Sequence, residues 1–420
     1  MRRLSSLPRR VRADGSDFAR FAAAAASRPM SSLPRRVLAD GPDFADFVSG
    51  RATSRAAAAA AAEPRPALSR ERLDPALLVD RFGRRHTYLR LSLTERCNLR
   101  CRYCMPAEGV SDLTPGGELL SAGEIERVAS VFARAGATKV RLTGGEPTLR
   151  RDLTQICGAI AALPGVESVG VTTNGINLLR KEGAGALLDN LVDAGLTSVN
   201  LSLDSLDATK FAALTRRPGK TLDRVLRAVD ACAAHATLKT KVNCVVMRGE
   251  NDDELAAFAR RWAGTGVEVR FIEWMPFQAN DWSAGKLVAY DDMLGALRSS
   301  LAPGERLYQR DSDAADPHDT TRWWRLGGAK LGFITSMTDH FCGGCNRVRV
   351  TADGSLKTCL FGSDSVSLRD VLRGGASDAD LAAAVHAALQ KKHFRHGGHG
   401  GAEDLAKHAG ENRHMVRIGG

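Results

Sequence analysis

From about residue 78 to residue 290, short hydrophobic segments alternate with longer amphipathic segments, and polar or glycine-rich turns separate them. The short segments have the length of buried strands, whereas the longer ones repeat their apolar residues at helical spacing. Helices between successive strands favour parallel pairing, because a parallel crossover needs a dozen or more residues. The predicted strands are 87–93, 139–142, 168–173, 198–203, 240–246 and 268–272, with helices over 121–135 and 222–234.

Six β-α units are too few to close an eight-stranded barrel. The pattern therefore predicts an α/β fold built as an open, partial (β/α)6 barrel of the TIM type. Three parts follow along the chain: an extension over 1–75, a core over 76–290 and a C-terminal region over 291–420.

Glycine and polar motifs follow five of the six predicted strands. In parallel α/β folds, functional residues gather at the carboxyl ends of the strands. The five motifs therefore predict one shared site. They are Cys97, the Gly-Gly-Glu-Pro turn at 144–147, Thr-Thr-Asn-Gly at 172–175, Ser-Leu-Asp at 202–204 and Glu-Trp-Met-Pro at 273–276.

Three cysteines after the first strand have the spacing Cys-x3-Cys-x2-Cys: Cys97, Cys101 and Cys104. A four-iron cubane cluster usually takes four cysteine ligands, so three thiolates leave one iron open to another ligand. A structural zinc site would need a fourth ligand, and His86 is the only local candidate. The spacing favours an iron-sulfur cluster over zinc.

A second group of three cysteines lies near the C-terminus, at Cys342, Cys345 and Cys359. A zinc ribbon would need a second cysteine pair, and His340 is the nearest alternative ligand. This group therefore also favours a cluster with an open iron, which could bind substrate directly.

Four arginines fall on predicted strands beside these motifs: Arg90, Arg141, Arg347 and Arg349. A buried guanidinium is costly unless it meets a carboxylate or an anionic ligand. A buried salt bridge explains any one of them equally well. Together, beside two clusters, they favour a polyphosphate substrate, which guanidinium groups bind through paired hydrogen bonds.

Charge is unevenly distributed along the 420 residues, whose formal net charge is +11. Residues 1–72 contain 14 arginines, no lysine and 7 acidic residues, a net +7. The remaining +4 is too small to predict a nucleic-acid surface. Early arginines followed by an alanine run resemble an organelle transit peptide, with a low-complexity extension as the alternative. No apolar run reaches the length of a membrane span.

The first cysteine group, with Tyr103 before its last cysteine and the 144–147 turn beyond it, resembles the radical S-adenosylmethionine superfamily. From about residue 78 onward the chain more closely resembles the GTP 3′,8-cyclase family, known as molybdenum cofactor biosynthesis protein A. The joint evidence is Leu-Thr-Glu-Arg-Cys at 93–97, Arg-Leu-Thr-Gly-Gly-Glu-Pro at 141–147, Lys-Val-Asn at 241–243, Phe-Ile-Glu-Trp-Met-Pro at 271–276, Asn-Arg-Val-Arg at 346–349 and the terminal Gly-Gly.

This resemblance implies the cofactors and the roles of individual residues. Two 4Fe-4S clusters would be held by the two cysteine groups, with the C-terminal region carrying the second and closing the barrel. A deoxyadenosyl radical would remove hydrogen from the ribose C3′ of GTP, and C3′ would then attack guanine C8. Arg90, Arg347 and Arg349 would be catalytic. Contacts to S-adenosylmethionine would come from Tyr103, Gly145, Ser202 and Met275, and contacts to GTP from Arg90, Arg141, Thr172, Lys241, Arg347, Val348 and Arg349.

The resemblance also implies partners and a location. It implies an electron donor, a downstream cyclic pyranopterin monophosphate synthase, a homodimer, and a mitochondrial matrix location for members with an N-terminal extension. Several features stay outside it: Trp323 and Trp324, the acidic segment 311–319, and the histidines His393, His396 and His399. A peptide-modifying radical enzyme and a zinc-stabilised nucleic-acid module are the competing hypotheses.

Overall fold

The computed structural model describes residues 68–183, 185–309, 318–362 and 365–419. Leu68–Gly420 form one compact unit. The transit-peptide prediction, most of the acidic segment and the last glycine fall outside the described residues, and the three-part division at residues 75 and 290 stays a prediction.

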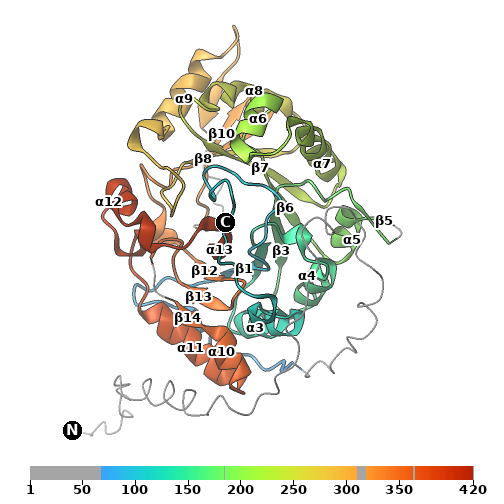
Figure 1. Ribbon diagram of the computed structural model, residues 1–420, viewed down its shortest axis with the longest axis vertical. Coiled ribbons are helices and arrows are strands. Elements are labelled where there is room, and N and C mark those ends of the chain that lie inside the picture. The colour runs from blue at the N-terminus through green and yellow to red at the C-terminus, as the bar shows by residue number, and fades with distance from the viewer. Residues whose placement is uncertain (1–67, 184, 310–317, 363–364, 420) are drawn as a thin grey trace, which may run out of the picture. The chain divides into compact units, whose positions relative to one another are not determined.

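A single sheet dominates this unit (Figure 1). All six predicted strands are present, and neighbours pair in parallel. The C-terminal region adds one parallel strand to each edge, β12 (Arg347–Val350) beside β1 and β11 (Ala329–Ile334) beside β8. The six strands are β1 (Tyr88–Ser92), β2 (Lys139–Thr143), β3 (Ser168–Thr173), β6 (Ser198–Ser202), β7 (Lys239–Val246) and β8 (Glu268–Glu273).

Short antiparallel strands extend both ends of the sheet. Beyond β12 lie β13 (Ser355–Lys357) and β14 (Val366–Ser367), and beyond β11 lie β10 (Arg322–Leu326) and β9 (Leu307–Gln309). Within the described residues β14 and β9 are the two ends of the strand order, so the prediction of an open, partial barrel is confirmed. A separate hairpin pairs β4 (Lys181–Glu182) with β5 (Gly185–Ala186).

Most helices lie around the outer side of the sheet, whereas α13 lies in the middle of the barrel (Figure 1). Both predicted helices are confirmed, and Ser121 starts the first with a capping box in which its hydroxyl accepts from the Glu124 amide. The helices are α3 (Ala122–Arg134), α4 (Leu153–Ala161), α5 (Leu187–Asp193), α6 (Ala208–Thr215), α7 (Leu222–Ala234), α8 (Leu255–Arg261), α9 (Tyr290–Ser299), α10 (Leu368–Arg373), α11 (Asp378–Gln390), α12 (Ala402–Lys407) and α13 (Met415–Ile418).

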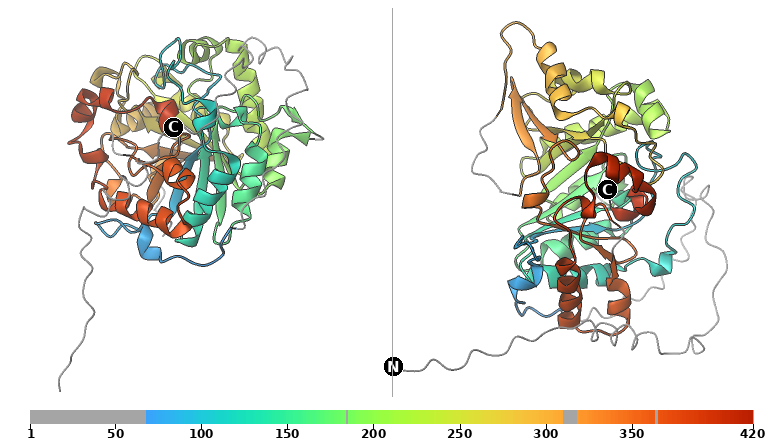
Figure 2. Two further views of the ribbon diagram at one scale, coloured as in Figure 1. Left: turned by 60° about the horizontal axis from the view of Figure 1, so that its bottom comes forward. Right: turned by 90° about the vertical axis from the view of Figure 1, so that its left-hand side faces the viewer.

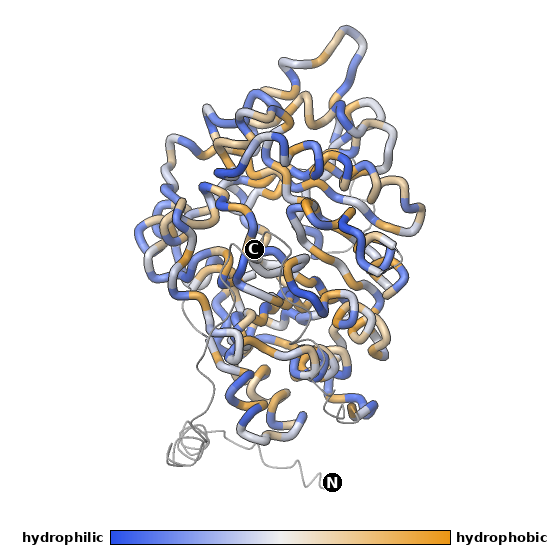
Figure 3. The backbone as a smooth tube through the Cα atoms, turned by 45° about the vertical axis from the view of Figure 1, so that its right-hand side comes forward, coloured by the Kyte–Doolittle hydropathy of each residue, from blue (hydrophilic) through white to orange (hydrophobic). Residues whose placement is uncertain are grey.

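Strand alternation separates the core from the inner face of the barrel. On β7, Val242 and Cys244 are buried in the main hydrophobic core, whereas Lys241 and Asn243 line an inner cavity. The side-chain period of two in a strand produces this division. Hydrophobic and hydrophilic stretches are interleaved along the chain (Figure 3). Among the described residues, no helix is long and apolar enough to cross a bilayer.

The first described segment of the chain packs against a helix of the C-terminal region. The 3-10 helix η1 (Pro75–Leu78) packs on α11, and both views of Figure 2 show this blue segment beside the orange-red C-terminal helices. The last helix, α13, runs into the middle of the barrel, where the C-terminus is marked in Figure 1. The fold therefore places the C-terminal tail beside the carboxyl ends of the strands.

Candidate functional site

A cavity of about 550 Å³ occupies the inside of the curved sheet. Both cysteine groups line it, which brings together residues separated by more than 230 positions in the sequence. One predicted site residue is absent from its lining: Val348 is 1% exposed and lies in the hydrophobic core, so only its backbone can reach a ligand. The other predicted ligand-contacting residues that line the cavity are Arg90, Tyr103, Arg141, Gly145, Thr172, Ser202, Lys241, Met275, Arg347 and Arg349.

The loop after β1 holds the first cysteine group. Its backbone is pinned to α6, because Arg100 N donates to the Thr215 carbonyl (3.0 Å) and Arg102 N to the Leu214 carbonyl (2.9 Å). Burial raises the pKa of Cys97 to about 12. The pKa of Cys101 is raised by burial, then by Asp204 and the neighbouring thiols, so the three sulfurs lie close enough to repel one another when ionised. A metal cation bound to the three sulfurs would offset both their burial and their mutual repulsion, as expected if these cysteines are metal ligands.

His86 does not take part in this group. Its Nε2 lies 3.1 Å from Asp80 Oδ2, and the imidazole is 1% exposed. Burial is the main cause that lowers its pKa to about 4. His86 is also absent from the cavity lining. The local fourth ligand that a zinc site would need is therefore engaged elsewhere.

The Gly-Gly-Glu-Pro turn after β2 packs backbone against backbone on the cysteine loop. Gly145 N donates to the Thr94 carbonyl (2.6 Å), and Glu146 N donates to the Arg96 carbonyl (2.7 Å). A Cβ atom on Gly145 would lie 2.3 Å from Arg96 O, closer than real Cβ atoms approach. Only glycine permits this contact, which fixes the turn beside the cluster ligands.

Glu146 ties this turn to the end of β3. Its carboxylate accepts from Thr173 Oγ1 (2.6 Å), Asn174 N (2.8 Å) and Thr148 Oγ1 (2.6 Å). Burial raises the pKa of Glu146 against the lowering effect of these hydrogen bonds. Adjacent strand ends are thereby held in one arrangement around the cavity.

Tyr103 and Asp204 connect the cysteine loop to β6 and β7. The Tyr103 hydroxyl donates to Asp204 Oδ2 (2.8 Å), and Val245 N donates to Asp204 Oδ1 (2.9 Å). Burial raises the pKa of Asp204 to about 6, although both hydrogen bonds oppose this shift. Ser202 and Met275 also line the inner cavity.

The second cysteine group lies in a more cationic environment. Cys342 and Cys345 flank the 3-10 helix η7 (Cys342–Gly344), and Lys392 Nζ is 3.7 Å from Cys345 Sγ. Burial opposes ionisation of Cys345, but Lys392 and Arg347 outweigh it and lower its pKa. Arg84 Nη1 also donates to the Cys342 carbonyl (2.7 Å). Neighbouring cations would stabilise thiolates and any anionic centre that they bind.

Three arginines stand side by side on adjacent strands and line the cavity that both cysteine groups line. In the parallel register, Arg90 on β1 is opposite Arg141 on β2 and opposite Arg349 on β12. Like charges directly opposite each other destabilise a sheet. Burial, with repulsion from neighbouring cations, lowers the pKa of Arg90 to about 10 and of Arg349 to about 9. A polyanion placed here would relieve both costs.

The hydrogen-bond partners of Arg141 and Arg347 test the alternative that these arginines form buried salt bridges. Arg141 donates to Tyr88 Oη (2.6 Å) and Ser198 Oγ (3.3 Å), and Arg347 donates to Thr320 Oγ1 (3.2 Å). Their described partners are hydroxyl and main-chain oxygens rather than carboxylates, which leaves the positive charge of Arg347 for an anion, whereas Tyr88 offsets part of the Arg141 charge when its hydroxyl ionises. Lys241 differs, because its Nζ lies 2.6 Å from Glu268 Oε2.

The pKa values of Lys241 and Glu268 are both lowered, but for different reasons. The pKa of Glu268 is lowered to about 2, since Lys241, Lys330 and Lys239 outweigh its burial. Lys241 shares that single carboxylate and faces Arg270, so burial and repulsion from Arg270 lower its pKa to about 7. The proton on Lys241 is therefore held weakly until an anion binds nearby.

Sequence reasoning missed several polar residues of the cavity. Tyr88, Lys139, Asn243 and Arg270 all line it. Burial opposes ionisation of Tyr88, but Arg141 and Arg90 outweigh it and lower its pKa to about 6. Tyr88, Lys139 and Asn243 each lie two positions from a residue that the sequence analysis predicted at the site, and Arg270 lies at an alternate position of β8. Polar residues at every second position of otherwise hydrophobic strands were the available signal.

The C-terminal tail reaches the arginine row. The Gly419 carbonyl accepts from Arg90 Nη2 (3.4 Å) and from Arg349 Nη1 (3.5 Å). Gly419 has φ +76°, and a Cβ there would lie 2.7 Å from Thr143 Oγ1. Glycine is required by both conformation and space.

The two tryptophans and the three histidines that the family resemblance does not explain lie in different parts of the structure. Trp324 Nε1 donates to Tyr290 Oη (3.0 Å), and the Trp323 ring lies beneath Lys330 Nζ (4.8 Å). His396 is 4% exposed and lines the main cavity, whereas His393 and His399 line a smaller one. The three histidines therefore do not form one cluster.

Comparison with known proteins places these features in a family. Residues 91–261 match the Radical SAM superfamily, and residues 267–398 match Molybdenum Cofactor Synthesis C. The mitochondrial GTP 3′,8-cyclase of Arabidopsis thaliana is 47% identical over 82% of this chain and 84% of that protein. Molybdenum cofactor biosynthesis protein 1 of Dictyostelium discoideum is 44% identical over 82% of this chain and 52% of that protein.

The chain thus spans about half the length of relatives such as the Dictyostelium protein. Among solved structures, Streptococcus suis SuiB bound to S-adenosylmethionine is 15% identical with a TM-score of 0.47, over 67% of this chain and 63% of that one. The high identity to a cyclase matched over most of its length agrees with the motifs, the partial barrel and the first cysteine loop. The chain belongs to the GTP 3′,8-cyclase family of the radical S-adenosylmethionine superfamily.

Proposed function

We propose that this chain catalyses the S-adenosylmethionine-dependent cyclisation of GTP to (8S)-3′,8-cyclo-7,8-dihydroguanosine 5′-triphosphate, the first step of molybdenum cofactor biosynthesis. One observation carries the proposal: the row Arg349, Arg90 and Arg141 crosses three adjacent strands inside the cavity that both cysteine groups line. Three cations in register favour a triphosphate, and the cavity that they share with both cysteine groups favours a nucleotide that reaches both.

The residues present fit a four-iron cluster at Cys97, Cys101 and Cys104. Three partly buried cysteines line a cavity of about 550 Å³, which leaves the fourth iron for a ligand from that cavity. When bound, this cluster and S-adenosylmethionine supply the radical that removes the C3′ hydrogen. The chain's own contribution is to hold the methionine and adenosine ends beside Gly145, Tyr103, Ser202 and Met275.

The donor set of the second group supports a second 4Fe-4S cluster. Cys342, Cys345 and Cys359 supply three soft thiolate ligands, and Lys392 and Arg347 compensate negative charge there. The guanine would face this group, as the family resemblance implies. Val348 would contribute through its backbone.

The cations have separate roles in this proposal. Arg141 and Lys241 bind and orient the triphosphate together with Thr172. Arg347 and Arg349 orient the nucleotide beside the second group, and Arg90 assists the closing reduction, a role that the family resemblance implies. Holding C3′ and C8 at reacting distance is worth several kcal/mol, about 7–11 for well-oriented groups.

Partners and location form the last part of the proposal. The product would pass to a cyclic pyranopterin monophosphate synthase, and an electron donor and a homodimeric state complete the system. We place the protein in the mitochondrial matrix, which the arginine-rich, lysine-free start of the sequence supports.

The test uses the full chain, reconstituted anaerobically with iron and sulfide and then reduced. S-adenosylmethionine is added with and without GTP, and 5′-deoxyadenosine and cyclised nucleotide are measured by mass spectrometry. Both products are expected with GTP, and both should vanish in C97A. C342A should lose the cyclised nucleotide. Cys157 offers a matched control, since it is buried in the core away from the cavity.

Each alternative result has a defined meaning. Deoxyadenosine without change to GTP would retain the radical chemistry and reject the substrate. A protein that retains zinc and forms neither product would reject the enzymatic proposal altogether. C157S should resemble the wild type in every case.

A further inference from the structure

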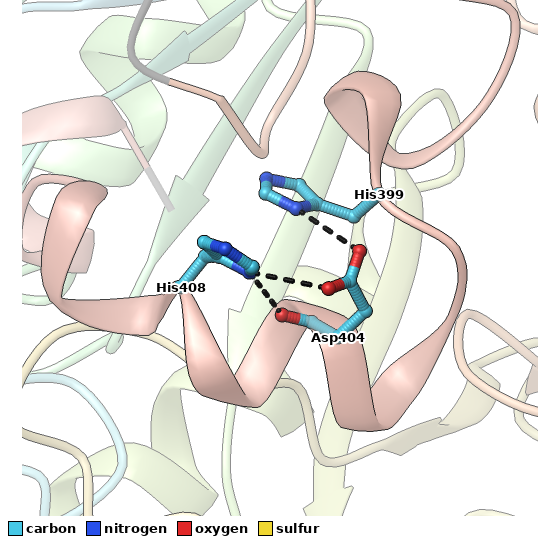
Figure 4. Close-up of side chains that lie close together, drawn as sticks. All are labelled: His399, Asp404 and His408. Carbon is cyan, nitrogen blue, oxygen red and sulfur yellow. Dashed lines mark hydrogen bonds and ion pairs between the residues drawn. The ribbon is translucent and has the colours of Figure 1, made fainter.

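Three polar side chains converge outside the main cavity, on the segment that leads to the C-terminal tail. They are His399, Asp404 and His408, and Figure 4 shows both imidazole rings turned toward the carboxylate. One ligand atom from each lies within 4.8 Å of the others. His399 Nδ1 is 3.5 Å from Asp404 Oδ2, and His408 Nδ1 is 3.3 Å from Asp404 Oδ1.

These separations fit metal ligands better than they fit hydrogen bonds. N–H···O hydrogen bonds have a usual range of about 2.7–3.2 Å, and charge-assisted ones are shorter still. Tetrahedral zinc binds imidazole nitrogen and carboxylate oxygen at about 2.0–2.2 Å, so neighbouring ligand atoms lie roughly 3.3–3.5 Å apart. The two observed separations, 3.3 and 3.5 Å, fall in that second range.

The surrounding backbone holds the carboxylate in place. Gly400 N donates to Asp404 Oδ2 (2.8 Å), which fixes the side chain across the turn before α12. His408 Nδ1 also lies 2.8 Å from the main-chain oxygen of Asp404. His408 Nδ1–H donates this hydrogen bond, so a metal ion bound at this nitrogen displaces that proton and requires the ring to turn away from the carbonyl.

Space for further ligands adjoins the three side chains. His399 and His408 line a cavity of about 200 Å³ that His393 and Glu411 also line. Three protein ligands beside such a cavity leave a coordination position for water or for a fourth side chain. Two imidazoles and one carboxylate suit a first-row transition ion, whereas Mg²⁺ and Ca²⁺ prefer oxygen ligands alone.

We propose that His399, Asp404 and His408 bind one divalent transition-metal ion, with zinc as the best fit, separately from the six clustered cysteines. The ion anchors the segment from His399 to His408, which precedes the C-terminal tail in the sequence. Leu405, on α12, shares a hydrophobic cluster with Ile418. Ile418 directly precedes Gly419, whose carbonyl meets Arg90 and Arg349, so the anchored segment supports the tail at the arginine row.

The experiment measures zinc and iron in the same samples of full-length, cluster-reconstituted protein after dialysis against a slight excess of zinc. The variants are His399→Gln and His408→Gln. The matched control is His235→Gln, because His235 Nε2 lies 3.4 Å from Asp189 Oδ1 in a comparable surface pair. Among the described residues, His235 belongs to no group of three converging ligand atoms.

The wild type and His235→Gln should each retain one zinc per chain, and both site variants should lose it without loss of iron. Zinc-edge X-ray absorption should show nitrogen and oxygen ligands only. Zinc content equal in wild type and both site variants, or sulfur in the zinc shell, would overturn the site. Hydrogen exchange over residues 399–419 should slow with zinc in the wild type, and exchange unaffected by zinc would overturn the anchoring role.

Discussion

Replacing Gly145 by alanine should disrupt the contact between the Gly-Gly-Glu-Pro turn and the first cysteine loop. The new Cβ would lie 2.3 Å from Arg96 O and 2.7 Å from Glu95 O, both main-chain atoms. Ordinary van der Waals contact begins at 3.4 Å, so the shorter distance falls short by 1.1 Å (3.4 − 2.3). No side-chain rotation can relieve this clash, and the backbone that carries Cys97 must move by about 1 Å.

The magnitude follows from that displacement. Overpacking typically costs about 1–3 kcal/mol of stability. A misplacement of about 1 Å in a positioned site can lower activity by roughly 10²-fold. We therefore expect Gly145→Ala to lose both stability and turnover, with the larger loss in turnover because the displaced loop carries cluster ligands.

The assay compares Gly145→Ala with Gly295→Ala in urea unfolding, in S-adenosylmethionine affinity and in 5′-deoxyadenosine formation. Gly295 lies within α9, and a Cβ there would meet nothing within 4 Å. Its replacement should stabilise the protein by about 0.5–1 kcal/mol, since alanine is the better helix former. A Gly145→Ala protein with wild-type stability and turnover would refute the packing argument.

Three further predictions concern the inner cavity. Asp204 has its pKa raised from 3.8 to about 6, so its contribution to stability is present below pH 3.8 and is lost as pH rises through 6. The free energy of unfolding of Asp204→Asn relative to wild type, measured in urea, should therefore rise by about 2 kcal/mol between pH 4 and pH 7, and a difference independent of pH would argue against a buried carboxylate. Because the pKa of Lys241 is lowered to about 7, the affinity for GTP should fall as pH rises from 6.5 to 8.5. Calorimetry should find a weaker pH dependence of this affinity in Lys241→Arg, whose side chain stays charged. An equal pH dependence in both proteins would exclude Lys241 from the phosphate site. Iron analysis should find about eight atoms per reconstituted chain and about four in either Cys104→Ala or Cys345→Ala, whereas an unchanged count in Cys345→Ala would reject the second cluster.

The strands and the site motifs could be predicted because local physics determines them. Each predicted strand is a short hydrophobic run, and five of the six end in a glycine or polar motif at the same edge of the sheet. The prediction that Cys97 and Gly145 lie at one site is borne out by their shared cavity. Residue roles in binding remain predictions.

Other features depend on long-range contacts that local patterns do not encode. The alignment of Arg90 with Arg349 needs β12 to pair with β1, although more than 250 residues separate them. Arg270 was missed because its strand was recognised only by its hydrophobic residues, while its side chain faces inward. The family resemblance predicts that Val348 contacts GTP, but strand alternation buries its side chain in the core and leaves only its backbone for such a contact.

The account rests on one claim: that the cavity holds S-adenosylmethionine and GTP together, with the ribose C3′ hydrogen facing the first cysteine group. Mass spectrometry of 5′-deoxyadenosine formed from GTP deuterated at C3′ tests it most directly. The account predicts one deuterium transferred to 5′-deoxyadenosine, along with cyclised nucleotide that lacks it. Unlabelled 5′-deoxyadenosine formed with the label retained in the nucleotide would contradict the account.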